Sequence, residues 1–139
     1  TEDEKRVEAM ENSAARYDTG TPMAKGDPLN FILNDMQQNE HLRESMKLAD
    51  GMQNALGAVE PGTDRGVKQG NLAVLRTAFM PAVLVEIGFG SNAQDMAFMT
   101  NDRDQNKLAN AIADAAVDYL NAYWASVNGV ADRTTGGHP

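Results

Sequence analysis

The sequence predicts a helix-rich α/β chain whose sheet is incomplete. Apolar residues recur at helical spacing over three long stretches, whereas only two short stretches have the apolar, β-branched composition of strands. Two strands cannot cover the apolar faces of three long helices. We therefore expect further strands of the same protein to precede Thr1, so that these residues form one part of a larger domain.

The long helices are predicted at residues 1–17, 28–56 and 102–127. The first has Thr1 and Glu4 at capping-box spacing. The second begins at Asp27 and Pro28, an acidic N-cap followed by a proline at the first helical position. The third ends before Gly129, which suits a C-cap, and it carries a stripe that should be buried. That stripe comprises Leu108, Ile112, Ala116, Tyr119, Leu120, Tyr123 and Trp124.

Two strands are predicted at residues 71–77 and 82–88. The connection between them is too short for a parallel crossover, so they would pair antiparallel. A short helix capped by Ser91 or Asn92 should follow the second strand. Residues 129–139 form a predicted flexible tail.

The composition excludes several classes of protein. The 139 residues carry a formal net charge of -8, and the basic residues are scattered among the acidic ones, which argues against nucleic-acid binding. There is no cysteine, which excludes disulfides, cysteine zinc sites and a cysteine nucleophile. The longest apolar run, near residues 80–89, is interrupted by Pro81 and Glu86 and is too short to span a bilayer.

Glu86 is the residue whose setting best suggests chemistry. It follows apolar residues near the carboxyl end of the second predicted strand, and strand alternation places it on the same face as Leu84. A partly desolvated carboxylate there would have a raised pKa suited to general acid–base catalysis. The same pattern equally fits a structural carboxylate paired with Arg65, Lys68 or Arg76.

The sequence around Glu86 resembles a known enzyme family. The run RGVKQGNLAVLRTAFMPAVLVEIGFGSN, residues 65–92, is similar to the signature of the zinc-dependent N-acetylmuramoyl-L-alanine amidases of the Amidase_3 type. Two upstream stretches resemble the helical region of that family, AMENSAAR at residues 9–16 and FILNDMQQNEHLRESMKLAD at residues 31–50. The likeness extends to about Trp124 and is most specific in residues 65–92.

The resemblance implies a three-layer αβα sandwich and a peptidoglycan hydrolase. The bond cleaved would be the amide between N-acetylmuramic acid and the L-alanine of the stem peptide. Zn²⁺ held by a His-Glu-His set would be the cofactor, and Glu86 would be the catalytic general acid–base. Arg65 and Lys68, near the expected cleft, would bind a stem-peptide carboxylate or a muramoyl oxygen, or would be structural partners of nearby acids.

Location and partners also follow from the resemblance. The expected partner is peptidoglycan, with an activator or regulatory protein as a second one. The expected location is extracytoplasmic, in the periplasm or cell envelope, although no signal peptide is visible in this sequence.

The zinc ligands of the family have no counterpart in this sequence. They lie N-terminal to the matching region, so we expect them to precede Thr1. The two histidines are His41 and His138. His41 has Glu40 and Glu44 within reach on a helix, a spacing that can hold a metal, but a solvated helix face explains the same residues. His138 lies in the tail and has no predicted role.

Two functions are therefore weighed. Residues 1–128 would be the C-terminal portion of an amidase catalytic domain, inactive when isolated from its zinc ligands. The alternative is a degenerate amidase-like module that binds or regulates at the cell wall without metal chemistry. A third possibility, a cytosolic helical interaction domain, has only the missing signal peptide in its favour. No role is predicted for Asn12.

Overall fold

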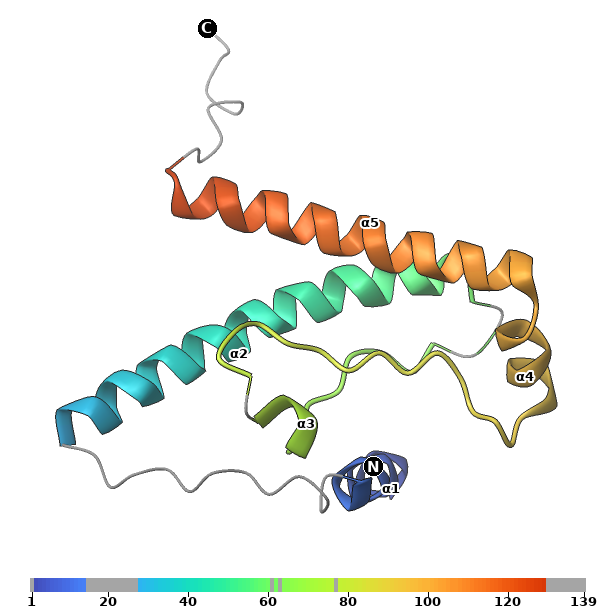
Figure 1. The fold of residues 1–139 in the computed structure, drawn as a ribbon, viewed down its shortest axis with the longest axis horizontal. Helices are drawn as coiled ribbons and strands as arrows, with labels where there is room; N and C mark the ends of the chain where they lie inside the picture. The colour runs from blue at the N-terminus through green and yellow to red at the C-terminus, as the bar shows by residue number, and fades with distance from the viewer. Residues whose placement is uncertain (1, 15–27, 61, 63, 77, 130–139) are drawn as a thin grey trace, which may run out of the picture. The chain divides into compact units, whose positions relative to one another are not determined.

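The computed structural model describes residues 2–14, 28–60, 62, 64–76 and 78–129. Helices within these ranges follow the order drawn in Figure 1: α1 (Glu2–Ala14), α2 (Pro28–Gly57), α3 (Ala73–Arg76), α4 (Ala93–Met99) and α5 (Asp102–Val127). The chain divides into two compact units. Unit 1 comprises Thr1–Ala49 and Arg65–Glu86, and unit 2 comprises Asp50–Asp64 and Ile87–Pro139.

The predicted helices are confirmed wherever the structure describes them. α2 and α5 match their predicted bounds closely, and α1 covers the described part of the first predicted helix. Asn92 caps α4, because its side chain accepts hydrogen bonds from the backbone N–H groups of Gln94 and Asp95. After α5, Gly129 has a φ of 69°, the left-handed conformation that a helix C-terminus favours. From residue 130 onward, the predicted tail lies outside the described residues.

The predicted sheet is wrong, and with it the three-layer αβα sandwich. The described residues contain no strand. The first predicted strand, residues 71–77, instead contains helix α3, which starts with a turn in which Leu75 N donates to Leu72 O at 3.1 Å. Its Ala, Leu and Arg residues are good helix formers, so the local preference agrees with this outcome.

The second predicted strand, residues 82–88, is an extended run without a strand partner in the described part of the chain. Alternation of apolar residues predicts an extended backbone and its two faces. It does not supply the neighbouring strand whose hydrogen bonds make a sheet. The pattern therefore predicted the alternating burial of residues 83–86 correctly and their pairing in a sheet wrongly.

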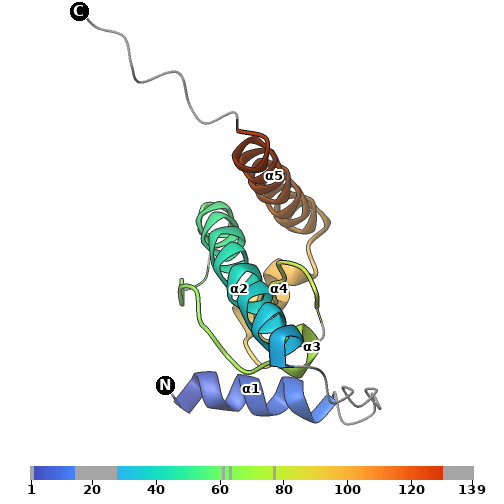
Figure 2. The same ribbon diagram turned by 90° about the vertical axis from the view of Figure 1, so that its left-hand side faces the viewer.

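In unit 1, α1 lies against α3, as Figure 2 shows. The contact joins residues far apart in the sequence. Asn12 of α1 donates from Nδ2 to Asn71 O at 2.9 Å, and its Oδ1 accepts from Ala73 N at 2.6 Å. Ala73 is the first residue of α3, so Asn12 binds an N–H that the helix itself leaves without an acceptor.

Unit 2 contains the buried apolar side chains found among the described residues. They come from the end of α2, from α4 and from α5: Met52, Leu56, Phe98, Leu108 and Ala115. α4 packs against α5. Asn101 caps α5, accepting from Arg103 N at 3.0 Å and Asp104 N at 3.2 Å.

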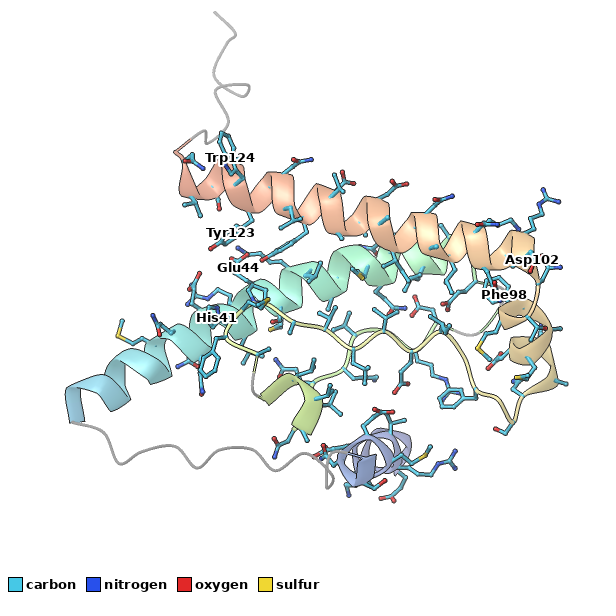
Figure 3. The ribbon with its side chains drawn as sticks, viewed as in Figure 1. His41, Glu44, Phe98, Asp102, Tyr123 and Trp124 are labelled. Carbon is cyan, nitrogen blue, oxygen red and sulfur yellow. The ribbon has the colours of Figure 1, made fainter. Side chains whose placement is uncertain are left out.

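The predicted buried stripe of α5 is correct as far as Tyr119, which is half-buried, and wrong for Leu120, Tyr123 and Trp124, which are exposed. Leu108 is buried, and Ile112 and Ala116 are half-buried. Near the C-terminal end of the helix, where Figure 3 labels Tyr123 and Trp124, Trp124 is 65% exposed. The spacing identified a common face of the helix, but it does not show how much of that face is covered. In the ranges that the structure describes, no helix combines the length and the apolar character needed to cross a bilayer.

Candidate functional site

The three predicted site residues lie on one segment of unit 1, residues 65–86, which we call the site segment. Arg65 and Lys68 precede α3, and Glu86 lies in the extended run that follows it. All three side chains are exposed. The structure thus places the predicted residues on one continuous segment that lacks a sheet beneath it.

Two helices of unit 1 hold the site segment through polar side chains. Asn12 of α1 binds Asn71 and Ala73, at the start of α3. Ser45 of α2 accepts a hydrogen bond from Ala82 N at 2.9 Å through Oγ, and the same hydroxyl donates to His41 O at 2.7 Å. The backbone N–H groups of Ala73 and Ala82 therefore find their acceptors on side chains rather than on a neighbouring strand.

A third polar contact joins the site segment to α2, just before α3 begins. Gln69 Nε2 lies 3.3 Å from Met46 Sδ. Thioether sulfur is a weak acceptor, so this contact contributes less than those of Asn12 and Ser45. It nevertheless places the stretch that includes Lys68 next to the helix.

Glu86 is exposed, so the prediction of a partly desolvated carboxylate is wrong. The predicted alternation holds up to this residue: Val83 and Val85 are half-buried, whereas Leu84 and Glu86 are exposed. The half-buried valines lie on one side of the run and leave the carboxylate in solvent. The side chain of Arg76, one of the three predicted structural partners, lies outside the described residues.

The turn that follows Glu86 belongs to unit 2 and is held by Asp95. Asp95 Oδ2 accepts a hydrogen bond from Phe89 N at 2.9 Å. Gly88 has a φ of 141°, and a Cβ at this position would lie 3.0 Å from Asp95 Cβ. Glycine is therefore required both by the backbone conformation and by the close approach of Asp95.

The predicted metal candidate on α2 has ordinary ion-pair partners. Figure 3 shows His41 and Glu44 on this helix, where His41 is half-buried and Glu44 is buried. Lys47 Nζ lies 2.6 Å from Glu44 Oε1, and Arg43 lies 3.3 Å from Glu40. No three His, Cys, Asp or Glu side chains of the described chain are grouped so that they could hold a metal ion. The residues present do not fit a His-Glu-His zinc set.

Three carboxylates of unit 2 interact around Glu60. Burial raises the pKa of Glu60 above its ordinary value, and the negative charges of Asp95 and Asp64 raise that pKa further. Within the described chain, Glu60 Oε1 is buried without a hydrogen-bond partner. Gln53 Nε2 donates to Asp64 Oδ1 at 2.5 Å. Asp95 is thus shared between the turn after Glu86 and this acidic group.

Sequence patterns missed Asn12, Ser45, Asp95 and Glu60. For Asp95 a signal was present, because Asn92 and Asp95 have the spacing of a helix N-cap and its third helical residue. Asn12 and Ser45 bind backbone groups far along the chain, so no local pattern marks them.

Comparison with known proteins places these residues in a family. The family model described as N-acetylmuramoyl-L-alanine amidase (Amidase_3) matches residues 7–118, a range that includes the whole site segment. The chain belongs to this family. The family predicted from residues 65–92 is therefore confirmed.

Several curated proteins are similar to this member of the Amidase_3 family. An uncharacterized cell wall amidase of Bacillus anthracis is 37% identical over 83 residues, which cover 60% of this chain and 16% of the relative. N-acetylmuramoyl-L-alanine amidase AmiC of Neisseria meningitidis is 31% identical over 117 residues, 84% of this chain and 28% of the relative. The protein YqiI of Bacillus subtilis is 29% identical over 124 residues, 86% of this chain and 58% of the relative.

The chain thus spans only part of the length of these relatives. No solved structure matches it significantly.

Proposed function

We propose that this chain is part of a peptidoglycan amidase that cleaves the amide between N-acetylmuramic acid and the L-alanine of the stem peptide. The observation that carries the proposal is the family match, which runs through the entire site segment. Two relatives are named as a cell wall amidase and an N-acetylmuramoyl-L-alanine amidase. Residues 1–128 are the proposed extent of the amidase portion.

Glu86 is the proposed general acid–base. Its exposed carboxylate can reach a substrate without the chain opening first. It would take a proton from water as the water oxygen adds to the amide carbonyl carbon. It would then give that proton to the nitrogen of L-alanine as the C–N bond breaks. Both transfers require the carboxylate to be held at hydrogen-bond distance from the reacting atoms.

Arg65 and Lys68 are the proposed substrate-binding residues. Both are exposed cations on the site segment that also carries Glu86. A stem peptide carries carboxylates, and a charged hydrogen bond from a guanidinium or an ammonium group would orient it. The proposed partners are peptidoglycan and an activator or regulatory protein, and the proposed location is the periplasm or cell envelope.

Zinc is part of the proposal for the whole protein. Because the described residues do not offer three suitable ligands, the zinc would be held by residues other than these. The two amidase relatives are much longer than the part that this chain matches, so the remaining residues of such a protein could supply the ligands. The isolated chain of 139 residues is accordingly proposed to be inactive.

The test is a turnover measurement on the full-length protein, supplied with zinc, with Glu86→Gln alongside. We expect the variant to keep its zinc content and to lose turnover about 10²- to 10⁴-fold, because the side-chain amide of glutamine cannot accept the proton from water. Glu40→Gln is the matched control, since Glu40 is an exposed glutamate on α2 outside the site segment. The isolated chain should release no stem peptide in the same assay.

Full turnover by Glu86→Gln would remove Glu86 from the mechanism. If the full-length protein binds peptidoglycan but neither binds zinc nor cleaves, a cell-wall-binding module replaces the enzyme as the proposed function.

A further inference from the structure

Ser45 links α2 to the site segment four residues before Glu86 along the chain. Its side chain is half-buried on α2. Its Oγ accepts from Ala82 N at 2.9 Å, and Ala82 is the first residue of the extended run, residues 82–88, that contains Glu86. The Ser45 hydroxyl therefore binds the start of the run that carries the proposed catalytic carboxylate.

The second hydrogen bond of Ser45 determines the direction of the first. The hydroxyl proton is donated to His41 O, one turn earlier on α2, at 2.7 Å. With its proton committed to the helix, the oxygen has only lone pairs to offer, and these accept from Ala82 N. The side chain is thus fixed on α2 by one bond and fixes the extended run by the other.

The extended run transmits this fixed point to Glu86. Val83 and Val85 are half-buried between Ala82 and Glu86, and Leu84 alternates with them on the exposed side. Glu86 lies four residues after Ala82, and the partial burial of Val83 and Val85 between them restricts how freely the run can turn. A shift at Ala82 would therefore move or turn the carboxylate of Glu86.

We propose that Ser45 is a positioning residue for Glu86, acting through the N–H of Ala82. The inference rests on the proposed role of Glu86 for its catalytic consequence. The anchoring of Ala82 by the hydroxyl can be measured without any catalysis. The test therefore has two separate readouts, hydrogen exchange and turnover, both on the full-length protein.

Ser45→Ala removes the acceptor, and Ser45→Thr keeps a hydroxyl at the same position. Hydrogen exchange of the Ala82 amide, followed residue by residue, should be about tenfold faster in Ser45→Ala, because the lost hydrogen bond opposes local opening. Ser45→Thr should restore slow exchange. The matched control is Ser13→Ala: Ser13 donates to Met10 O at 2.7 Å on α1 but is exposed. It should leave exchange in this run unchanged.

Turnover of a soluble muramoyl-peptide separates positioning from general weakening. We expect Ser45→Ala to lower kcat about 10- to 100-fold with little change in KM, since a displaced catalytic group loses rate while substrate binding continues. Ser45→Thr should recover most of kcat. Unchanged exchange in Ser45→Ala, or faster exchange with unchanged kcat, would overturn the proposal.

The outcomes for Ser45 and for Glu86 remain distinguishable. If Glu86→Gln keeps full turnover, the role of Glu86 fails, and Ser45 then cannot be its positioning residue even if exchange shows the anchor. If Glu86→Gln is inactive while Ser45→Ala is fully active, the proposed function stands and the positioning role fails.

Discussion

Among the described side chains, the five buried apolar residues all lie in unit 2, whereas the one buried residue of unit 1 is a carboxylate, Glu44. Unit 2 is held by side chains such as Leu108 and Phe98, each contributing about 1.5–3 kcal/mol when fully buried. In unit 1 the site segment is held by the amide of Asn12 and the hydroxyl of Ser45. A hydrogen bond of this kind contributes only about 0.5–1.5 kcal/mol.

The comparison teaches where the proposed catalytic residue is vulnerable. Glu86 belongs to the unit that depends on directional polar contacts, which small displacements break. Unit 2 depends on burial, which tolerates small displacements better. Damage to unit 2 should therefore appear mainly as lost stability, and damage to the anchors of unit 1 mainly as lost activity.

The largest effect on stability should come from Leu108→Ala in unit 2. Leu108 is 6% exposed, and the substitution leaves a cavity, so we expect the free energy of unfolding to fall by about 2–5 kcal/mol. The measurement is urea denaturation of the full-length protein. Leu120→Ala, on the same helix but 59% exposed, should have less than half this effect. If both variants lost the same free energy of unfolding, Leu108 would not be more deeply buried than Leu120 in solution.

An intermediate effect should come from Asn12→Ala in unit 1. It removes the acceptor for Ala73 N and the donor to Asn71 O, so we expect a loss of about 1–2 kcal/mol in the same urea measurement. Asn106→Ala is the control, since Asn106 donates only locally to Asp102 O and is exposed. An equal effect of both variants would show that Asn12 does not link α1 to α3 in solution.

The smallest effect should come from Glu60→Gln in unit 2, and it should depend on pH. Since folding raises the pKa of Glu60 above 4.5, the folded state holds the proton more tightly than the unfolded state does. The stabilisation by that proton is complete below the unfolded pKa and is lost as pH rises through the folded pKa. Glutamine stays neutral, so the variant should be more stable than the wild type at pH 7, by less than about 1 kcal/mol because solvent screens a half-buried group.

Thermal unfolding from pH 3 to pH 8 measures this difference. The two proteins should converge at the acidic end. A wild type that gains stability relative to Glu60→Gln as pH rises would contradict the cause assigned here, which is burial beside Asp95 and Asp64.

The helices could be predicted from the sequence because their determinants are local. Asn92 and Gly129 act on residues within one turn of themselves, and the sequence states their spacing directly. The sheet could not be predicted, because a strand depends on a partner that alternation does not reveal. Residues 71–77 show the risk, since their composition suited both an extended run and the helix α3.

The candidate site was predicted in part. Resemblance to the family marked Arg65, Lys68 and Glu86, and their roles stay predictions. The predicted desolvation of Glu86 failed because the apolar neighbours Val83 and Val85 turn to the other side of the run. Ser45 and Asn12 were missed because each acts on backbone far away in the chain, where no spacing rule applies.

The bond between Asn12 and Asn71 also has a consequence for the order of assembly during synthesis. The two residues are 59 positions apart. A ribosome adds roughly 5–20 residues per second, so Asn71 is synthesised about 3–12 s after Asn12. Closing so long a loop then carries an entropy penalty that a local turn avoids. The contact between α1 and the site segment can therefore form only after Asn71 has been synthesised.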